Sequence, residues 1–121
     1  MSKPTDTQPV FPFKTSVLEQ LHSEYGSPLY VYNASYIKKR INKLSALFKE
    51  IPVNWLYAMK ANDNPHILKL FAAAGFGFDT VSYEEAVLGP HLVSLDKIFY
   101  TENNMSDTEM NSAMQKGVLL N

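Results

Sequence analysis

The chain has 121 residues, 11 basic and 12 acidic side chains, no cysteine and a formal net charge of −1. Its 45% hydrophobic and 19% charged residues are typical of one globular domain rather than a disordered chain. The absence of cysteine excludes disulfides and cysteine-ligated zinc, and the near-neutral charge gives no reason to expect a nucleic-acid or membrane partner. The longest apolar stretch is too short to cross a bilayer and the N-terminus lacks a signal-peptide pattern, so we expect a cytoplasmic protein.

The N-terminal part predicts an arm, two helices and a short strand. Residues 1–14 hold three prolines and no periodicity, which predicts a flexible arm. A helix is expected over 15–25, ended by Gly26. Residues 29–32 (LYVY) predict a strand, and residues 33–49 a second helix with an apolar stripe at helical spacing. We interpret the basic run on that helix as a solvated face rather than a phosphate or nucleic-acid patch.

From residue 51 onward, strands alternate with helices. Strands are predicted at 53–59, 78–81 and 97–101, with a fourth beginning at 118, and a helix follows each of the first three. This order calls for a parallel sheet with right-handed crossovers. The presumed strand centres recur at intervals of 21 residues: Tyr57, Phe78, Phe99 and Leu120. A repeat of constant length favours the N-terminal half of a (β/α)8 barrel, truncated here, over an open doubly wound sheet.

A lysine marks the end of the first predicted barrel strand. Strand alternation places Ala58 and Lys60 on the face opposite the bulkier side chains. If the 21-residue step sets the register, Asp79 and Tyr100 share this face with Lys60. The C-terminal end of a parallel strand is where α/β proteins place their chemistry. In an enclosed, partly dry cavity the pKa of a lysine falls, and its neutral amine can attack an aldehyde. The alternatives are a strand-end lysine in water and a loop or capping aspartate.

Four sequence blocks resemble one enzyme family. The block YAMKAN at 57–62, followed by Asn64-Pro65, resembles the YAxKAN…NP signature of the fold-type III pyridoxal-phosphate decarboxylases. Residues 77–85 resemble the family's GFDVVSxxE, and similarity continues through 97–106. Residues 25–32 resemble its N-terminal YGTPLYVYD strand. These blocks stand in the family's order and cover about residues 25–121, and within the family the chain is most similar to diaminopimelate decarboxylases.

The resemblance implies a fold and a chemistry. The fold would be an alanine-racemase-like α/β barrel, with residues 29–32 joining a C-terminal β-domain absent from this chain. Lys60 would hold pyridoxal 5'-phosphate as a Schiff base, with Ala58 and Asp79 beside the cofactor and Asp79 helping to keep the lysine nitrogen protonated. The enzyme would be a homodimeric lyase that converts meso-2,6-diaminopimelate to L-lysine and CO2. Neither a nucleic-acid nor a membrane partner is expected.

Three further residues match family positions near the implied site. Asn103 and Asn104 would end a strand at the mouth of the site, where substrate and loop contacts are equally plausible, whereas Glu85 is explained as well by capping the next helix with Ser82. Ornithine, arginine and carboxynorspermidine decarboxylases share these blocks, and a non-catalytic pyridoxal-phosphate carrier and a flavodoxin-like module are further alternatives. Because the family's phosphate loop would lie beyond Asn121, we expect the chain to be inactive alone. The histidines show no paired ligand spacing, so no metal is expected.

Overall fold

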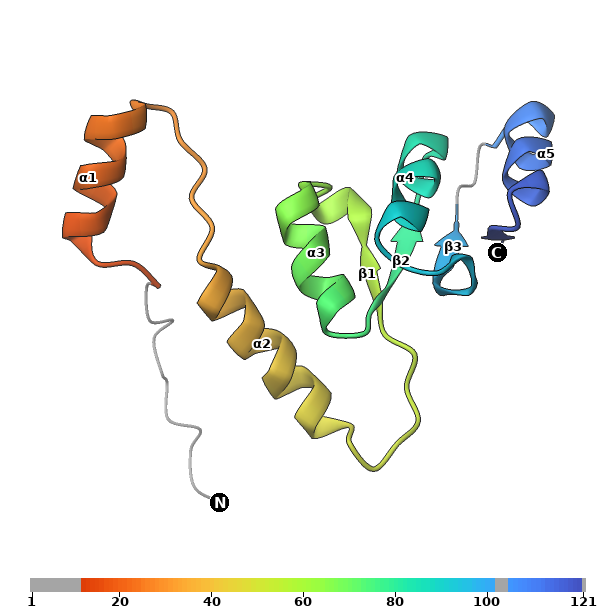
Figure 1. Ribbon diagram of the computed structural model, residues 1–121, viewed down its shortest axis with the longest axis horizontal. Coiled ribbons are helices and arrows are strands. Elements are labelled where there is room, and N and C mark those ends of the chain that lie inside the picture. Colours follow the sequence, from red (N-terminus) through yellow and green to blue (C-terminus); the bar gives the residue numbers. More distant parts are fainter. Residues whose placement is uncertain (1–11, 102–104, 121) are drawn as a thin grey trace, which may run out of the picture.

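The computed structural model describes residues 12–101 and 105–120, and its centre is a parallel four-stranded sheet (Figure 1). The strands pair in sequence order and are Leu56–Ala58 (β1), Gly77–Thr80 (β2), Ile98–Tyr100 (β3) and Leu119–Leu120 (β4). The connecting helices are Pro65–Ala73 (α3), Tyr83–Leu88 (α4) and Asp107–Gln115 (α5). Three single-turn 3-10 helices complete the connections: Met59–Ala61 (η1), Gly89–His91 (η2) and Leu95–Lys97 (η3). The predicted series of three βα units and a fourth strand is therefore confirmed.

Side-chain caps begin the three connecting helices. The Asn64 side chain accepts the N–H of His66 at 2.9 Å, with proline at the first helical position of α3. Ser82 caps α4, and Ser106 and Glu109 form a reciprocal capping box at α5. Each cap satisfies backbone donors that would otherwise lack a partner, which is worth about 1 kcal/mol. Local sequence therefore fixes where each helix leaves the strand before it.

The helices cover one face of the sheet. Under α3, the side chains of Met59, Leu68 and Phe78 are fully buried together. Under α4 and α5 the core continues with Ala86, Ile98, Tyr100, Ala113 and Val118. The register places Ala58, Asp79 and Phe99 on the other face, because side chains alternate along each strand. We call this second face the open face of the sheet.

The segments before the sheet differ in how much they bury. Helix α2, Ala34–Leu47, buries Ile41 and packs against α3. Helix α1, Thr15–Tyr25, buries no residue and lies at the far end of the molecule from the sheet (Figure 1). The predicted strand at 29–32 is not formed among the described residues: these residues join no ladder, and Tyr30 is 86% exposed. A strand needs a neighbour for its backbone groups, and the described residues offer this segment none. Most of the predicted arm, residues 1–11, lies outside the described residues.

The sheet register corrects the 21-residue spacing. Tyr57 pairs with Phe78 as predicted, but Phe78 pairs with Ile98 rather than with Phe99. Tyr100 therefore lies on the helix-covered face, where it is 1% exposed, and does not share the parity of Asp79. The step between register partners is 21 residues from β1 to β2 but 20 residues from β2 to β3 and from β3 to β4, where Phe99 pairs with Leu119 rather than with Leu120, so the connections are not of equal length. No helix in residues 12–101 or 105–120 is long and apolar enough to cross a membrane.

Candidate cofactor site

Lys60 lies in the 3-10 turn η1, two residues after the last residue of β1. The predicted strand over 53–59 is shorter in the structure, because regular pairing ends at Ala58. Met59 is fully buried on the helix-covered face, whereas Lys60 is exposed. The expected enclosed cavity around the lysine is therefore not formed by the described residues. The physical reason is that four strands make an open sheet, and only a closed barrel could surround the amine.

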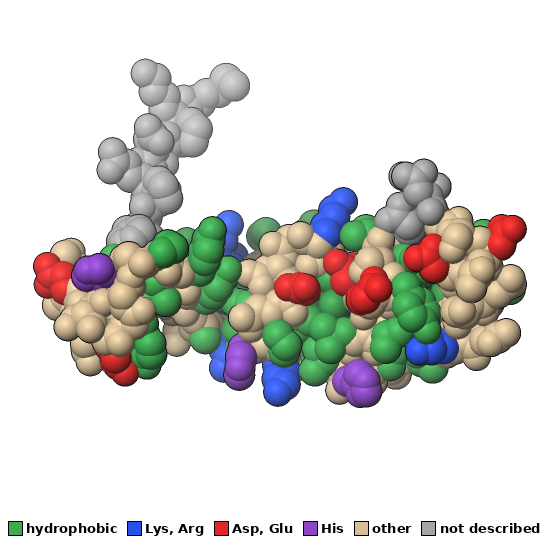
Figure 2. Space-filling model, turned by 90° about the horizontal axis from the view of Figure 1, so that it is seen from above, with side chains coloured by type: hydrophobic (Ala, Val, Ile, Leu, Met, Phe, Trp, Pro, Cys, Tyr) green, Lys and Arg blue, Asp and Glu red, His purple; other side chains and the backbone are tan. Residues whose placement is uncertain are grey.

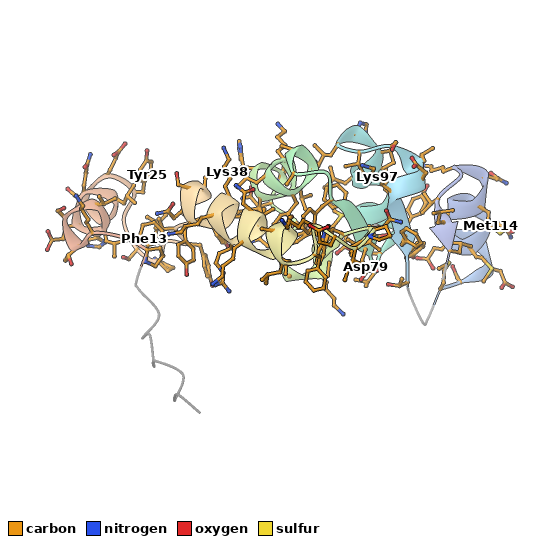
Figure 3. The ribbon with its side chains drawn as sticks, turned by 90° about the horizontal axis from the view of Figure 1, so that it is seen from below. Phe13, Tyr25, Lys38, Asp79, Lys97 and Met114 are labelled. Carbon is orange, nitrogen blue, oxygen red and sulfur yellow. The ribbon has the colours of Figure 1, made fainter. Side chains whose placement is uncertain are left out.

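Asp79 stands on the neighbouring strand, beside the end of β1. Its Cα is in register with that of Ala58, so both side chains share the open face. Ala58 is small and leaves space beside the carboxylate. Thr101, which follows β3, donates a hydrogen bond from its Oγ1 to Asp79 Oδ1 at 2.7 Å. Figure 3 shows Asp79 well separated from Lys38 of α2.

Asn62 fixes the turn that carries Lys60. Its carbonyl accepts a hydrogen bond from the Tyr57 hydroxyl at 3.2 Å, and its Oδ1 accepts the N–H of Asn64 at 3.0 Å. Its Nδ2 donates to the Tyr32 hydroxyl at 2.8 Å, which ties in the segment before α2. Desolvation, followed by the charges of Tyr32 and Asp63, raises the pKa of Tyr57 above its ordinary value of 10.0. Tyr57 therefore stays protonated at neutral pH and remains a donor to the turn.

Of the other predicted site residues, the structure describes Glu85. Glu85 serves the start of α4: its Oε2 accepts the N–H of Val81 at 2.8 Å, and its own N–H donates to Ser82 Oγ at 3.2 Å. This geometry matches the capping interpretation of the pair. Asn103 and Asn104 lie outside the described residues.

Figure 2 looks onto the side of the molecule toward which the strands point and shows acidic and apolar side chains interspersed on it. The C-terminal edge is where the helix-sheet connections of α/β domains place binding and catalytic groups. Lys60 lies two residues after the end of β1, and Thr101 directly follows β3. Asp79 lies one residue before the end of β2. One amine, one carboxylate and one hydroxyl therefore belong to the same edge.

Sequence reasoning overlooked Thr101 and Asn62 as site residues. Thr101 gave no signal by itself, because its contact with Asp79 depends on the register between β2 and β3. Asn62 did give a signal, since it ends the motif that contains Lys60. The type of residue was also informative, because an asparagine side chain can both donate and accept within a tight turn.

Parallel βα units with an amine and a carboxylate at the carboxyl ends of their strands define an α/β domain of the kind that carries barrel enzyme sites. The profile of one family, described as pyridoxal-dependent decarboxylase, pyridoxal binding domain, matches residues 34–120. The chain belongs to this family of pyridoxal-dependent decarboxylases. The predictions of the family and of pyridoxal phosphate as its cofactor are confirmed.

Individual relatives agree with this assignment. The diaminopimelate decarboxylase of Aquifex aeolicus is 33% identical over 104 residues, which are 85% of this chain and 24% of that protein. A structure of diaminopimelate decarboxylase from Helicobacter pylori, complexed with L-lysine, superimposes with a TM-score of 0.78 at 29% identity, over 86% of this chain and 27% of that one. Lysine/ornithine decarboxylase from Vibrio vulnificus has a TM-score of 0.74 at 23% identity, over 85% of this chain and 28% of its own, and shares the fold.

These comparisons also confirm the fold class. The four parallel βα strands match the N-terminal part of the barrel domain in the decarboxylase structures. The chain spans about a quarter of the length of the curated relatives that it matches. The structure therefore presents part of a barrel wall, with the candidate site at its carboxyl edge.

The residues at this edge fit the aldehyde end of pyridoxal phosphate. Lys60 is exposed and offers a primary amine, the only type of side chain that condenses readily with an aldehyde to form an imine. Asp79 offers a carboxylate that is already held by a hydrogen bond, and Ala58 leaves room on the same face. The donor set is therefore suited to holding this group through Lys60.

Proposed function

We propose that the complete protein is a pyridoxal-phosphate-dependent amino-acid decarboxylase that converts meso-2,6-diaminopimelate to L-lysine and CO2. The observation that carries the proposal is the position of Lys60, in the turn after β1 and two residues beyond the register partner of Asp79, within the pyridoxal-binding family match. Relatives named diaminopimelate decarboxylase align with about 85% of the chain and support this substrate.

Each site residue has a distinct task in this proposal. When bound, pyridoxal phosphate supplies an electron-accepting ring that makes loss of the α-carboxylate feasible. Lys60 would hold the cofactor covalently through its amine. Asp79 favours a proton on the Lys60 nitrogen, because a negative charge nearby stabilises the cationic form. Ala58 keeps the adjoining surface free of bulk.

The remaining parts of the proposal concern the complete protein. We expect a homodimer that acts in the cytoplasm, in which residues 29–32 pair with strands of a C-terminal β-domain. The segment is exposed, holds two tyrosines and has no strand neighbour within residues 12–101 and 105–120, which supports that placement. We expect the 121-residue chain by itself to be inactive, because the amine of Lys60 is exposed and water is not excluded from the open face.

The test combines covalent trapping with product analysis. The complete protein is incubated with pyridoxal 5'-phosphate, reduced with borohydride and digested, and peptide masses locate the label. We expect the label on Lys60, its loss in Lys60→Ala, and its persistence in Lys69→Ala, which removes another exposed lysine as a matched control. CO2 release is then measured with meso-diaminopimelate, ornithine, arginine and carboxynorspermidine.

Three outcomes would contradict different parts of the proposal. An unlabelled Lys60 would refute the cofactor site. A labelled protein that releases no CO2 from any of the amino acids would indicate a pyridoxal-phosphate carrier. Faster release from ornithine, arginine or carboxynorspermidine than from diaminopimelate would preserve the reaction class and refute the substrate.

A further inference from the structure

The hydroxyl of Thr101 makes a short contact with the Asp79 carboxylate. The distance from Thr101 Oγ1 to Asp79 Oδ1 is 2.7 Å, and the contact is partly buried between neighbouring strand ends. The carbonyl oxygen of Thr80 lies farther from the same hydroxyl, at 3.5 Å. The shorter distance and the negative charge of the acceptor both direct the hydroxyl proton to the carboxylate.

The backbone around this contact is held in place on both strands. The N–H of Thr101 donates to the carbonyl of Thr80 at 2.9 Å, which extends the pairing of β2 and β3 beyond the last strand residue. The hydroxyl of Thr80, which is fully buried, donates to the carbonyl of Phe99 at 3.0 Å. Because these bonds fix the position of Thr101, its hydroxyl is a stationary donor to Asp79.

The held carboxylate lies on the face that leads to Lys60. Asp79 and Ala58 are register partners, and Lys60 follows Ala58 by two residues. A free aspartate side chain rotates about two bonds and spreads its charge over several positions. A hydrogen bond to Oδ1 removes most of this freedom, so the charge stays over the open face of the sheet.

We propose that Thr101 is a positioning residue for the cofactor lysine, whose hydroxyl holds the Asp79 carboxylate where its charge stabilises the protonated nitrogen of Lys60. The inference rests on the proposed function, since it assumes that Lys60 carries pyridoxal phosphate. Thr101 itself needs no contact with the cofactor. Its effect passes through Asp79, and loss of the hydroxyl lets the carboxylate rotate away from the amine.

The test is the pH dependence of the absorbance of the lysine-bound cofactor in the complete protein. Thr101→Val keeps the shape of the side chain and removes the hydroxyl, whereas Thr101→Ser keeps the hydroxyl. We expect the midpoint of this absorbance titration to fall by about 0.5–1 pH unit in Thr101→Val. This shift is a fraction of the pKa change that a neighbouring opposite charge produces. Thr101→Ser restores the midpoint, and Thr101→Ala serves as a second hydroxyl-free variant should Thr101→Val not fold.

Two comparisons separate positioning from a general structural role. Thr80→Val removes a strand-end hydroxyl that donates to backbone only, so it is expected to lower stability and leave the pH midpoint unchanged. In an Asp79→Ala background, Thr101→Val is expected to have no further effect on the midpoint, because the two residues then act as one unit.

The outcomes distinguish this inference from the proposed function. If borohydride labels Lys60 but neither Thr101→Val nor Thr101→Ala moves the midpoint, the positioning role is refuted and the cofactor site stands. Equal shifts in Thr80→Val and Thr101→Val would also refute it, in favour of a general effect of strand-end packing. If Lys60 takes no label in the unaltered protein, the proposed function fails and this inference fails with it.

Discussion

Gly77, the first residue of β2, is a position where an added methyl group has no room. A Cβ there would collide with the carbonyl oxygen of Lys97 and lie 2.8 Å from Cδ2 of Leu56. Leu56 is 38% exposed and can rotate away, but the carbonyl belongs to the backbone that leads into β3. Overpacking costs about 1–3 kcal/mol, and the backbone clash places this case at the upper end. Alanine also stabilises the fold by about 0.5–1 kcal/mol, because it restricts the unfolded chain. Gly77→Ala should therefore lower the free energy of unfolding by about 2 kcal/mol.

Gly75→Ala provides the matched control two residues away. Gly75 has a φ of +87°, but nothing lies within 4 Å of an added Cβ. Alanine at this position costs only the penalty for left-handed backbone, about 1–2 kcal/mol. Because alanine also restricts the unfolded chain, the net loss in the free energy of unfolding is about 1 kcal/mol or less. Urea unfolding of the complete protein and amide hydrogen exchange in β1 and β2 measure both variants, and exchange localises the effect. Equal losses for the two variants would refute the steric argument.

Three smaller perturbations test other contacts. Tyr32→Phe removes the hydroxyl that accepts a hydrogen bond from the Asn62 side-chain amide. Amide hydrogen exchange in residues 59–64 should become about fivefold faster, as expected for loss of one hydrogen bond. Unchanged exchange would mean that this hydrogen bond does not stabilise the turn. Thr80→Val removes a buried hydroxyl bond to β3 and should lower unfolding free energy by about 1 kcal/mol, measured by urea titration. Hydrogen bonds from the Ser106 side chain and backbone hold the pKa of Glu109 below its ordinary value. The resulting stability is present above the unfolded-state pKa and is lost as pH falls through the folded-state pKa. In Ser106→Ala, an NMR titration should show the Glu109 pKa rising toward its ordinary value.

Local signals in the sequence predicted the order of elements. The caps at Asn64, Ser82 and Ser106 act within three residues of their partners, so their residue types and spacing suffice to locate the helix starts. The position of Lys60 just beyond the first strand was predictable for a similar reason, because its motif is contiguous and leads directly from strand to turn. These features depend on a few neighbouring residues and not on how distant segments meet.

Features that require a distant partner were not predictable in this way. Residues 29–32 have the composition of a strand, yet a strand exists only where another backbone completes its hydrogen bonds, and the described chain provides none. The enclosure expected around Lys60 failed for the same reason, since an amine becomes dry only when strands surround it on every side. Both errors concern surfaces that need additional strands.

The sheet register links the error at Tyr100 to the contact made by Thr101. A strict 21-residue step would place Tyr100 beside Asp79 and turn Thr101 toward the helices. The observed register is displaced by one residue, so Phe99 pairs with Asp79. Because alternate residues share a face, this displacement brings Thr101 to the side of Asp79 and sends Tyr100 into the core. The register between β2 and β3 therefore decides which side chain, a hydroxyl or a phenol, stands next to the carboxylate of the candidate site.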